Sequence, residues 1–167
     1  LDLHLVWRQL PQVEAESCNG CGRCRTLSPE MRMCPIFRYA PAEESSPRAK
    51  ANLMRAVLQG QLSTKSLASE ELKEIADLCV NCHQCRLECP AEVDIPKLMI
   101  EAKSQYVDAN GLDTTDWFLA RLDWVSRWGS RFGTIANWML HTRWTRWVIE
   151  KLTGLAQGRK LPRLAAT

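Results

Sequence analysis

The sequence lacks any long apolar run, because Arg, Asp or Lys interrupts every candidate stretch before the roughly 18 residues that a membrane-spanning helix needs. It also lacks a basic segment followed by an apolar core and a cleavage site, so no secretory signal is visible. Nowhere do apolar and polar residues alternate as they would in a half-buried strand. We therefore expect an all-α fold without a transmembrane segment.

The familiar catalytic motifs are absent as well. The sequence contains no G-x-G-x-x-G, no P-loop, no G-x-S-x-G and no H-E-x-x-H, so no nucleotide site or hydrolytic device is predicted. We assign no catalytic residue, and we expect no nucleic-acid partner. Any catalysis linked to this chain is expected to reside elsewhere.

Charge and tryptophan are unevenly spread along the 167 residues. Residues 1–112 hold 13 Lys and Arg against 15 Asp and Glu, whereas residues 113–167 hold 9 against 4. We expect an N-terminal linker at 1–14, a cysteine-bearing domain at 15–111 and a helical extension or linker at 112–167. Because the first residue is Leu, we also expect the chain to be part of a longer protein. Six of the seven tryptophans lie in the basic tail: Trp117, Trp124, Trp128, Trp138, Trp144 and Trp147.

Three helices are predicted within the cysteine-bearing part. Each begins at a capping residue with Pro or Glu one or two positions after it, and each has apolar residues at helical spacing. They start at Ser46, Ser69 and Asp94, and the first and third end at Gly60 and at Asn110 with Gly111.

The tail is predicted to form two or three amphipathic helices broken at Gly129, Gly133 and Gly154. Its Trp and Arg residues favour packing in a core or against another domain. Peripheral contact with the inner face of the cytoplasmic membrane is the alternative, since helices on membrane surfaces combine these residue types.

Eight cysteines form two similar sets, an internal duplication. Each set has three cysteines in the pattern C-x2-C-x2-C and a fourth followed by Pro; the sets are Cys18, Cys21, Cys24 and Cys34, and Cys79, Cys82, Cys85 and Cys89. Three thiolates at this spacing can bind three iron corners of one cubane cluster, and the fourth corner needs a ligand from elsewhere. The sequence therefore predicts two 4Fe-4S clusters.

The second set, C-x2-C-x2-C-x3-C-P, matches the ligand run of two-cluster bacterial ferredoxins, in which the fourth cysteine binds the other cluster. The first set departs from it, with nine residues between Cys24 and Cys34. The crossed assignment gives one cluster Cys18, Cys21, Cys24 and Cys89, and the other Cys79, Cys82, Cys85 and Cys34.

Residues between and beside the cysteines have lesser expected roles. Gly20 and Gly22 would let the backbone approach the cluster closely, and Pro35 and Pro90 would prevent a helix from continuing past the fourth cysteine. His83 is interpreted as a bystander between ligands.

Two other uses of cysteine compete with clusters. Zinc sites also use C-x2-C pairs, and bound zinc would make the chain a zinc-stabilised interaction module. A zinc site would not explain the third regularly spaced cysteine of each set. Disulfides suit secreted domains, and cysteines three residues apart rarely reach bridge geometry. A reducing, cytoplasmic compartment is the consequence.

With both motifs in view, residues 15 to 108 resemble the α-helical ferredoxin domain of succinate dehydrogenase iron–sulfur subunits and heterodisulfide reductase C subunits. A closer resemblance links four segments to the iron–sulfur region of FAD-linked oxidases of the D-lactate, glycolate and 2-hydroxyglutarate dehydrogenase type. These are CNGCGRCR (18–25), MCPIFR (33–38), ESSPRAKANLMRAVL (44–58) and CVNCHQCRLECPAEVDIPKL (79–98).

That resemblance implies a function for the chain as an electron-transfer domain. In the family, a flavin takes two electrons from a 2-hydroxy acid and passes them singly through the clusters to a downstream acceptor, such as a quinone or a cysteine-rich domain. FAD would lie on a separate domain or subunit. The alternative is an independent subunit like heterodisulfide reductase C, which receives electrons from a separate protein.

Metal content distinguishes the cluster interpretation from the zinc interpretation. The purified protein is expected to hold about eight iron atoms per chain and to show a broad absorbance at about 400 nm that dithionite bleaches. Iron and zinc analysis with an absorption spectrum measures this. Stoichiometric zinc without iron would contradict the cluster assignment.

Overall fold

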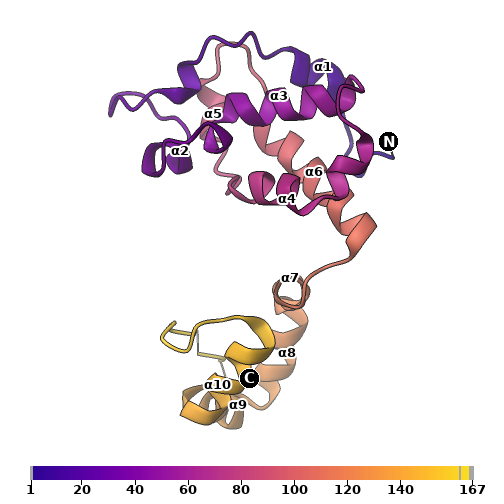
Figure 1. The fold of residues 1–167 in the computed structure, drawn as a ribbon. Coiled ribbons are helices and arrows are strands. Elements are labelled where there is room, and N and C mark those ends of the chain that lie inside the picture. Colours follow the sequence, from indigo (N-terminus) through magenta and orange to yellow (C-terminus); the bar gives the residue numbers. More distant parts are fainter. Residues whose placement is uncertain (1, 162, 166–167) are drawn as a thin grey trace. The chain divides into compact units, whose positions relative to one another are not determined.

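The computed structural model describes residues 2–161 and 163–165, which form helices joined by turns and loops (Figure 1). No strand occurs in this part of the chain, so the expected all-α fold is confirmed. The chain divides into two compact units, Leu1–Gly111 and Leu112–Thr167. Among the described residues, no helix is both long enough and apolar enough to span a bilayer.

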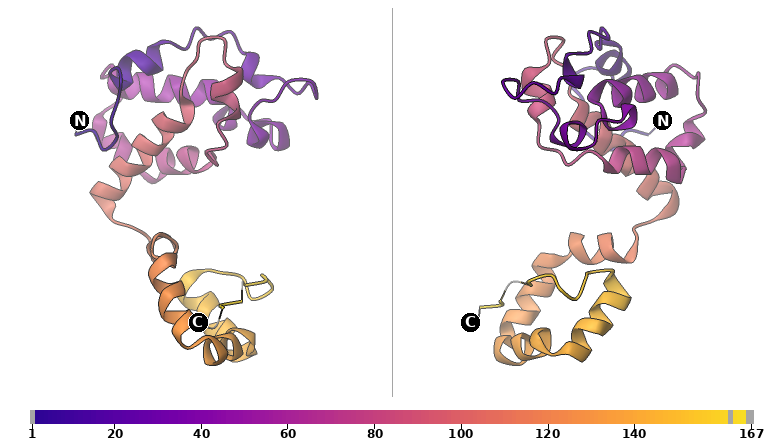
Figure 2. Two further views of the ribbon diagram at one scale, coloured as in Figure 1. Left: turned by 180° about the vertical axis from the view of Figure 1, so that it is seen from behind. Right: turned by 60° about the vertical axis from the view of Figure 1, so that its left-hand side comes forward.

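The first unit contains six α-helices and three short 3-10 helices within its described residues. Helix α3 packs against α1 and α6, and α6 in turn packs against α4 (Figures 1 and 2). The elements are α1 (Pro11–Glu16), η1 (Arg23–Arg25), α2 (Pro35–Tyr39), η2 (Glu43–Ser45), α3 (Pro47–Leu58), η3 (Thr64–Ala68), α4 (Glu70–Asp77), α5 (Gln84–Glu88) and α6 (Ile95–Asn110).

The three helices predicted from capping residues are α3, α4 and α6, and all three start where the sequence indicates. In each, the capping side chain accepts a hydrogen bond from a backbone N–H of the first turn, which has no partner within the helix. Ser46 accepts from Ala49 at 3.1 Å, Ser69 from Leu72 at 3.4 Å and Asp94 from Lys97 at 3.2 Å.

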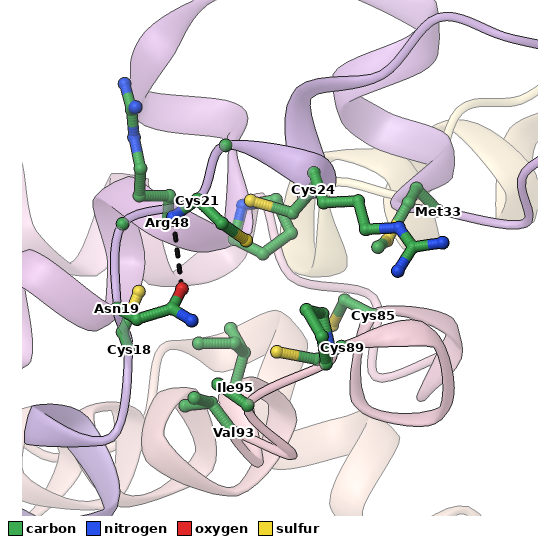
Figure 3. A pocket seen from close by; sticks show the side chains of 16 residues that line it. Cys18, Asn19, Cys21, Cys24, Met33, Arg48, Cys85, Cys89, Val93 and Ile95 are labelled. Atoms are coloured by element: carbon green, nitrogen blue, oxygen red, sulfur yellow. Dashed lines mark hydrogen bonds between the residues drawn. The ribbon is translucent and has the colours of Figure 1, made fainter.

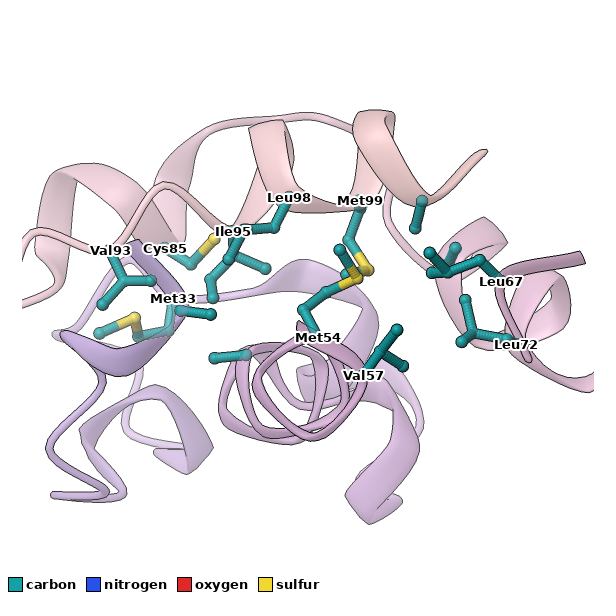
Figure 4. Close-up of a cluster of buried hydrophobic side chains, with 14 residues drawn as sticks. Met33, Met54, Val57, Leu67, Leu72, Cys85, Val93, Ile95, Leu98 and Met99 are labelled. Carbon is teal, nitrogen blue, oxygen red and sulfur yellow. The ribbon is translucent and has the colours of Figure 1, made fainter. Parts of the chain in front are cut away.

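The core of this unit lies where α3 meets α6 (Figure 4). Met54 and Val57 of α3 and Leu98 and Met99 of α6 are almost completely buried. Leu53 and Leu58 of α3 are only partly buried and pack at the edge of the core. The remaining buried apolar residues of the core are Ala15, Met33, Ala51, Leu67, Leu72, Ala76, Cys85, Val93, Ile95 and Ala102.

Glu101 of α6 is a fully buried carboxylate that fixes the N-terminal segment. It accepts hydrogen bonds from the backbone of His4 at 2.9 Å and of Leu5 at 3.1 Å, and from the Trp7 indole at 3.0 Å. Burial raises the pKa of Glu101, but these donors and Gln105 outweigh it, so the pKa lies below the usual 4.5. The carboxylate therefore stays charged and holds residues 4–7 against α6.

The described residues of the second unit form a ring of helices (Figure 2), made of α7 (Thr114–Ala120), α8 (Leu122–Arg131), α9 (Gly133–His141) and α10 (Arg143–Thr153). Helix α10 packs against both α7 and α9 and so closes the ring. Of the glycines expected to break helices, Gly133 begins α9 and Gly154 follows α10. Gly129 lies inside α8, so the prediction of a break there is wrong, because a glycine within a helix weakens it without ending it.

Tryptophan side chains of the second unit lie on its surface. Trp138 is 69% exposed and Trp144 is 71% exposed, and the other four are between 41% and 59% exposed. The expected packing of these residues in a core is therefore not found within their own unit. Packing against another domain stays a prediction.

Replacing Glu101 by Ala is expected to lower the free energy of unfolding by about 2 kcal/mol, because the partly buried donors of His4, Leu5 and Trp7 lose their acceptor. Urea unfolding measures this, and limited proteolysis at Arg8 should become faster. The carboxylate has a lowered pKa, so its contribution is present above pH 4.5 and is lost as the pH falls through the folded-state pKa. The exposed Glu74→Ala is the control, and equal stability of the two variants would contradict the role of Glu101.

Candidate metal centre

Both cysteine motifs adopt the same backbone conformation. The residues on either side of the middle cysteine have positive φ: 71° at Gly20 and at Gly22, and 51° at Asn81 and 59° at His83. Glycine adopts this region freely, and Asn and His are enriched there among other residues. The internal duplication is therefore one of structure as well as of spacing, and His83 has a backbone role.

The first motif runs from the end of α1 through η1. Cys18 follows the C-cap residue of α1, and Cys24 is the middle residue of η1. The Asn19 side chain accepts a hydrogen bond from the backbone N–H of Cys21 at 3.1 Å, and Arg55 of α3 donates to the Cys18 carbonyl at 3.4 Å. The turn is thus fixed both locally and to the central helix.

The second motif lies between α4 and α5. The backbone N–H of Cys79 bonds the Ala76 carbonyl at 2.9 Å, so the end of α4 determines where this cysteine lies. Cys82 occupies the turn and Cys85 lies in α5. Two of the four thiol-bearing residues are thus placed directly by helices.

The two fourth cysteines lie at opposite kinds of helix end. Cys34 is the N-cap residue of α2, and Pro35 is the first residue of that helix. Cys89 caps the C-terminus of α5, and Pro90 follows it. The expectation that proline prevents a helix after the fourth cysteine fits Pro90 but is wrong for Pro35, because proline is well suited to the first turn of a helix.

Four cysteines from the two motifs meet around a first cavity (Figure 3). Cys18, Cys21 and Cys24 come from the first motif and Cys89 from the second, and Figure 3 shows the Cys89 sulfur directed into the space between them. Cys85 borders the same cavity from behind. The other side chains around it include Met33, Arg48, Val93 and Ile95.

Cys85 also lines a second cavity. It is lined by Cys34 from the first motif and by Cys79, Cys82 and Cys85 from the second, together with residues such as Pro47 and Lys50. Each cavity therefore has three cysteines from one motif and the fourth cysteine of the other, and Cys85 lines both cavities. This grouping supports the crossed assignment of ligands.

Burial and mutual repulsion keep the inner thiols protonated in the free chain. Burial, with the neighbouring sulfurs of Cys79, Cys34 and Cys82, raises the pKa of Cys85 to about 12. Burial likewise raises the pKa of Cys24 above its usual value of 9.0. Such thiols lose their protons when a metal replaces them, so binding of the cluster and folding of this region are coupled.

The donor set fits two iron–sulfur clusters. All eight cysteines are free thiols. Within the described part of the chain, no three Cys, His, Asp or Glu side chains converge closely enough to hold one metal ion. The cysteines instead surround two spaces, and an iron–sulfur cubane is bound by four thiolates that are set apart at its corners.

Basic residues accompany both cavities, and no role in the site was predicted for two of them. Arg48 lines the first cavity and Lys50 the second, and both lie in the first turns of α3. The signal in the sequence was two cations close to a helix N-terminus, where the helix dipole disfavours positive charge unless an anion is near. Of the arginines beside the thiols, Arg25 pairs with Glu43 at 3.2 Å and Arg86 pairs with Asp94 at 3.3 Å.

Comparison with known proteins agrees with this geometry. Residues 14–93 match the model of a family described as a 4Fe-4S dicluster domain. The chain is 22% identical to a D-2-hydroxyglutarate dehydrogenase of Pseudomonas putida over 181 aligned positions, which cover 90% of the chain and 18% of that protein. A D-2-hydroxyglutarate dehydrogenase of Escherichia coli is 24% identical over 50% of the chain and 12% of its own length.

A shorter match involves a different enzyme. The acetyl-CoA decarbonylase/synthase complex subunit alpha of Methanococcoides burtonii is 37% identical over 65 residues, which are 38% of the chain and 8% of that subunit. No solved structure matches the chain. The chain spans less than a fifth of the length of each of these relatives.

The helices bring eight free cysteines around two cavities, and the family match covers the same region. Residues 14–93 therefore form a 4Fe-4S dicluster domain. Within that class, the chain is homologous to a region of the D-2-hydroxyglutarate dehydrogenases. The expected ferredoxin-like domain with two clusters is thereby confirmed.

Two single substitutions test the crossed assignment of the fourth ligands. Cys34→Ala is expected to lower the iron content from about eight to about four atoms per chain, because one cluster loses a corner ligand. Alkylation followed by peptide mass spectrometry should then modify Cys79 and Cys82 and leave Cys18 and Cys21 protected. Cys89→Ala is the matched variant with the reverse pattern. Modification of Cys18 and Cys21 in Cys34→Ala would refute the crossing.

Proposed function

We propose that this chain is the electron relay of a flavin-linked 2-hydroxy acid dehydrogenase. One observation carries the proposal: two sets of four cysteines surround neighbouring cavities in a dicluster domain whose relatives include two D-2-hydroxyglutarate dehydrogenases. When bound, a 4Fe-4S cluster accepts and releases one electron at a time. A pair of clusters therefore suits a donor that supplies two electrons.

The residues of the chain have three tasks in this function. Cys18, Cys21, Cys24 and Cys89 would hold one cluster, and Cys34, Cys79, Cys82 and Cys85 the other. The buried Cys85 lines both cavities, so only a thin layer of protein separates the two sites and an electron can cross between them. The exposed Cys21 and Cys82 place one edge of each site near solvent, where a donor and an acceptor can approach.

Oxidation of the substrate is assigned to a partner. The electrons would come from FAD on another domain or subunit, where a 2-hydroxy acid loses two electrons and two protons and becomes a 2-oxo acid. The acceptor would be a quinone or a cysteine-rich domain. Free thiols in every motif position suit a reducing compartment, and we place the chain in the cytoplasm on that ground.

Rapid mixing of the full-length protein with candidate substrates tests the relay. D-2-hydroxyglutarate, D-lactate or glycolate is expected to reduce the flavin first and then to bleach the cluster absorbance at about 400 nm, each in its own kinetic phase. A Cys21→Ala variant serves as the control, because its flavin should still be reduced while part of the later bleaching is lost. If the cluster absorbance bleaches only when a separate flavoprotein is added, the independent subunit is favoured. If the flavin is reduced but the clusters are not, the relay is contradicted.

A further inference from the structure

Lys50 is a buried cation next to the second cavity. Its side chain is only 1% exposed, and its ammonium group donates a hydrogen bond to the Ser45 carbonyl at 2.9 Å. No carboxylate forms an ion pair with it among the described residues. A buried charge that lacks a partner of opposite sign is costly, so its position calls for a negative group nearby.

The cysteines of the second site are the neighbours that can supply this negative charge. Lys50 lines the second cavity together with Cys34, Cys79, Cys82 and Cys85. The Ser45 carbonyl that accepts from Lys50 also accepts from the Cys34 thiol, with a distance of 3.9 Å between sulfur and oxygen. One carbonyl oxygen therefore holds the ammonium group beside a sulfur of the site.

The position of Lys50 in its helix strengthens this argument. It is the fourth residue of α3, at the end where the helix dipole is positive and disfavours a cation. The dipole and Lys50 thus add up to a positive potential at the second cavity. Negatively charged thiolates bound to iron would offset both the helix dipole and the Lys50 ammonium group.

The first cavity has a weaker positive environment. Its cations are Arg23, which is exposed to solvent, and Arg48, whose side chain is 26% exposed and forms an ion pair with Glu43 at 2.9 Å. Arg25 pairs with the same carboxylate. Solvent and Glu43 therefore screen the charge on this side, whereas neither acts on Lys50.

We propose that Lys50 is the built-in counter-charge of the second site and raises its reduction potential above that of the first site. Gaining an electron makes a cluster and its four thiolates more negative, and a buried cation nearby stabilises that reduced state. Electrons then pass from the site of Cys18, Cys21, Cys24 and Cys89 to the site of Cys34, Cys79, Cys82 and Cys85. This inference rests on the proposed function and adds a direction to it.

A redox titration of the full-length protein, followed by electron paramagnetic resonance, tests the proposal. In Lys50→Met one cluster is expected to shift to a more negative midpoint potential while the other is unchanged, and the affected cluster should be the higher-potential one in the wild type. Lys50→Gln, whose amide can still donate to the Ser45 carbonyl, should show the same shift even if Met disturbs packing. Lys50→Arg keeps the charge and should restore the potential.

The control is Lys73→Met, which removes a cation of α4 that is already paired with Asp77 at 2.8 Å and should leave both potentials unchanged. About eight iron atoms per chain in each variant would show that both clusters are present, so the proposed function is tested separately. Unchanged potentials in both Lys50→Met and Lys50→Gln would overturn the role of Lys50. A shift confined to the lower-potential cluster would overturn the direction of transfer.

Discussion

The packing of α3 against α6 is the interaction on which the rest of the first unit depends. The two helices bury Met54, Val57, Leu98 and Met99 against each other, and both cysteine motifs are fixed around them. Arg55 of α3 holds the Cys18 carbonyl of the first motif, and Lys103 of α6 holds the Cys79 carbonyl of the second at 3.3 Å. The apolar contact therefore sets the distance between the motifs, and hydrogen bonds from the same helices set their orientation.

Negative charge is the main difficulty that this domain has to accommodate. Four thiolates at each site repel one another, and burial adds to the cost, as the raised pKa of Cys85 shows. The N-terminal end of α3 supplies positive charge that offsets this repulsion. The charge comes from the helix dipole, from Arg48 near the first cavity and from Lys50 near the second. Unequal screening of these two cations makes the sites electrostatically different although their cysteine spacing is similar.

Much of the frame was predictable because it depends on local signals. Each predicted helix start depends on a hydrogen bond between residues only three positions apart, so tertiary packing is not needed to form it. The capping residues are Ser46, Ser69 and Asp94. The spacing of cysteines likewise identified the duplicated motif. The error at Gly129 arose because a glycine in a helix is tolerated when its neighbours favour the helix.

The burial of Lys50 and Glu101 could not be predicted in this way, because each lies on a helix where its sequence neighbours do not reveal its partners. Glu101 is buried because residues 4–7, almost a hundred positions away, return to α6 with their donors. Lys50 lines the same cavity as Cys34, Cys79 and Cys85, which come from distant parts of the sequence. Helix periodicity predicts on which face of a helix a residue lies, but it does not predict which polar or charged groups pack against that face.

The sequence by itself determined the helices, the eight thiols and their division into two duplicated motifs, because spacing and capping act over a few residues. Only the tertiary structure decided which cysteines face the same cavity, since that depends on how α3 and α6 bring the two halves together. The tertiary structure also decided which charged side chains are buried, namely Lys50 and Glu101. The cation beside the second site follows from long-range packing, which local pattern does not encode. The crossing of the fourth cysteines was already expected from the spacing of the second motif, and the grouping of cysteines around the two cavities supports it.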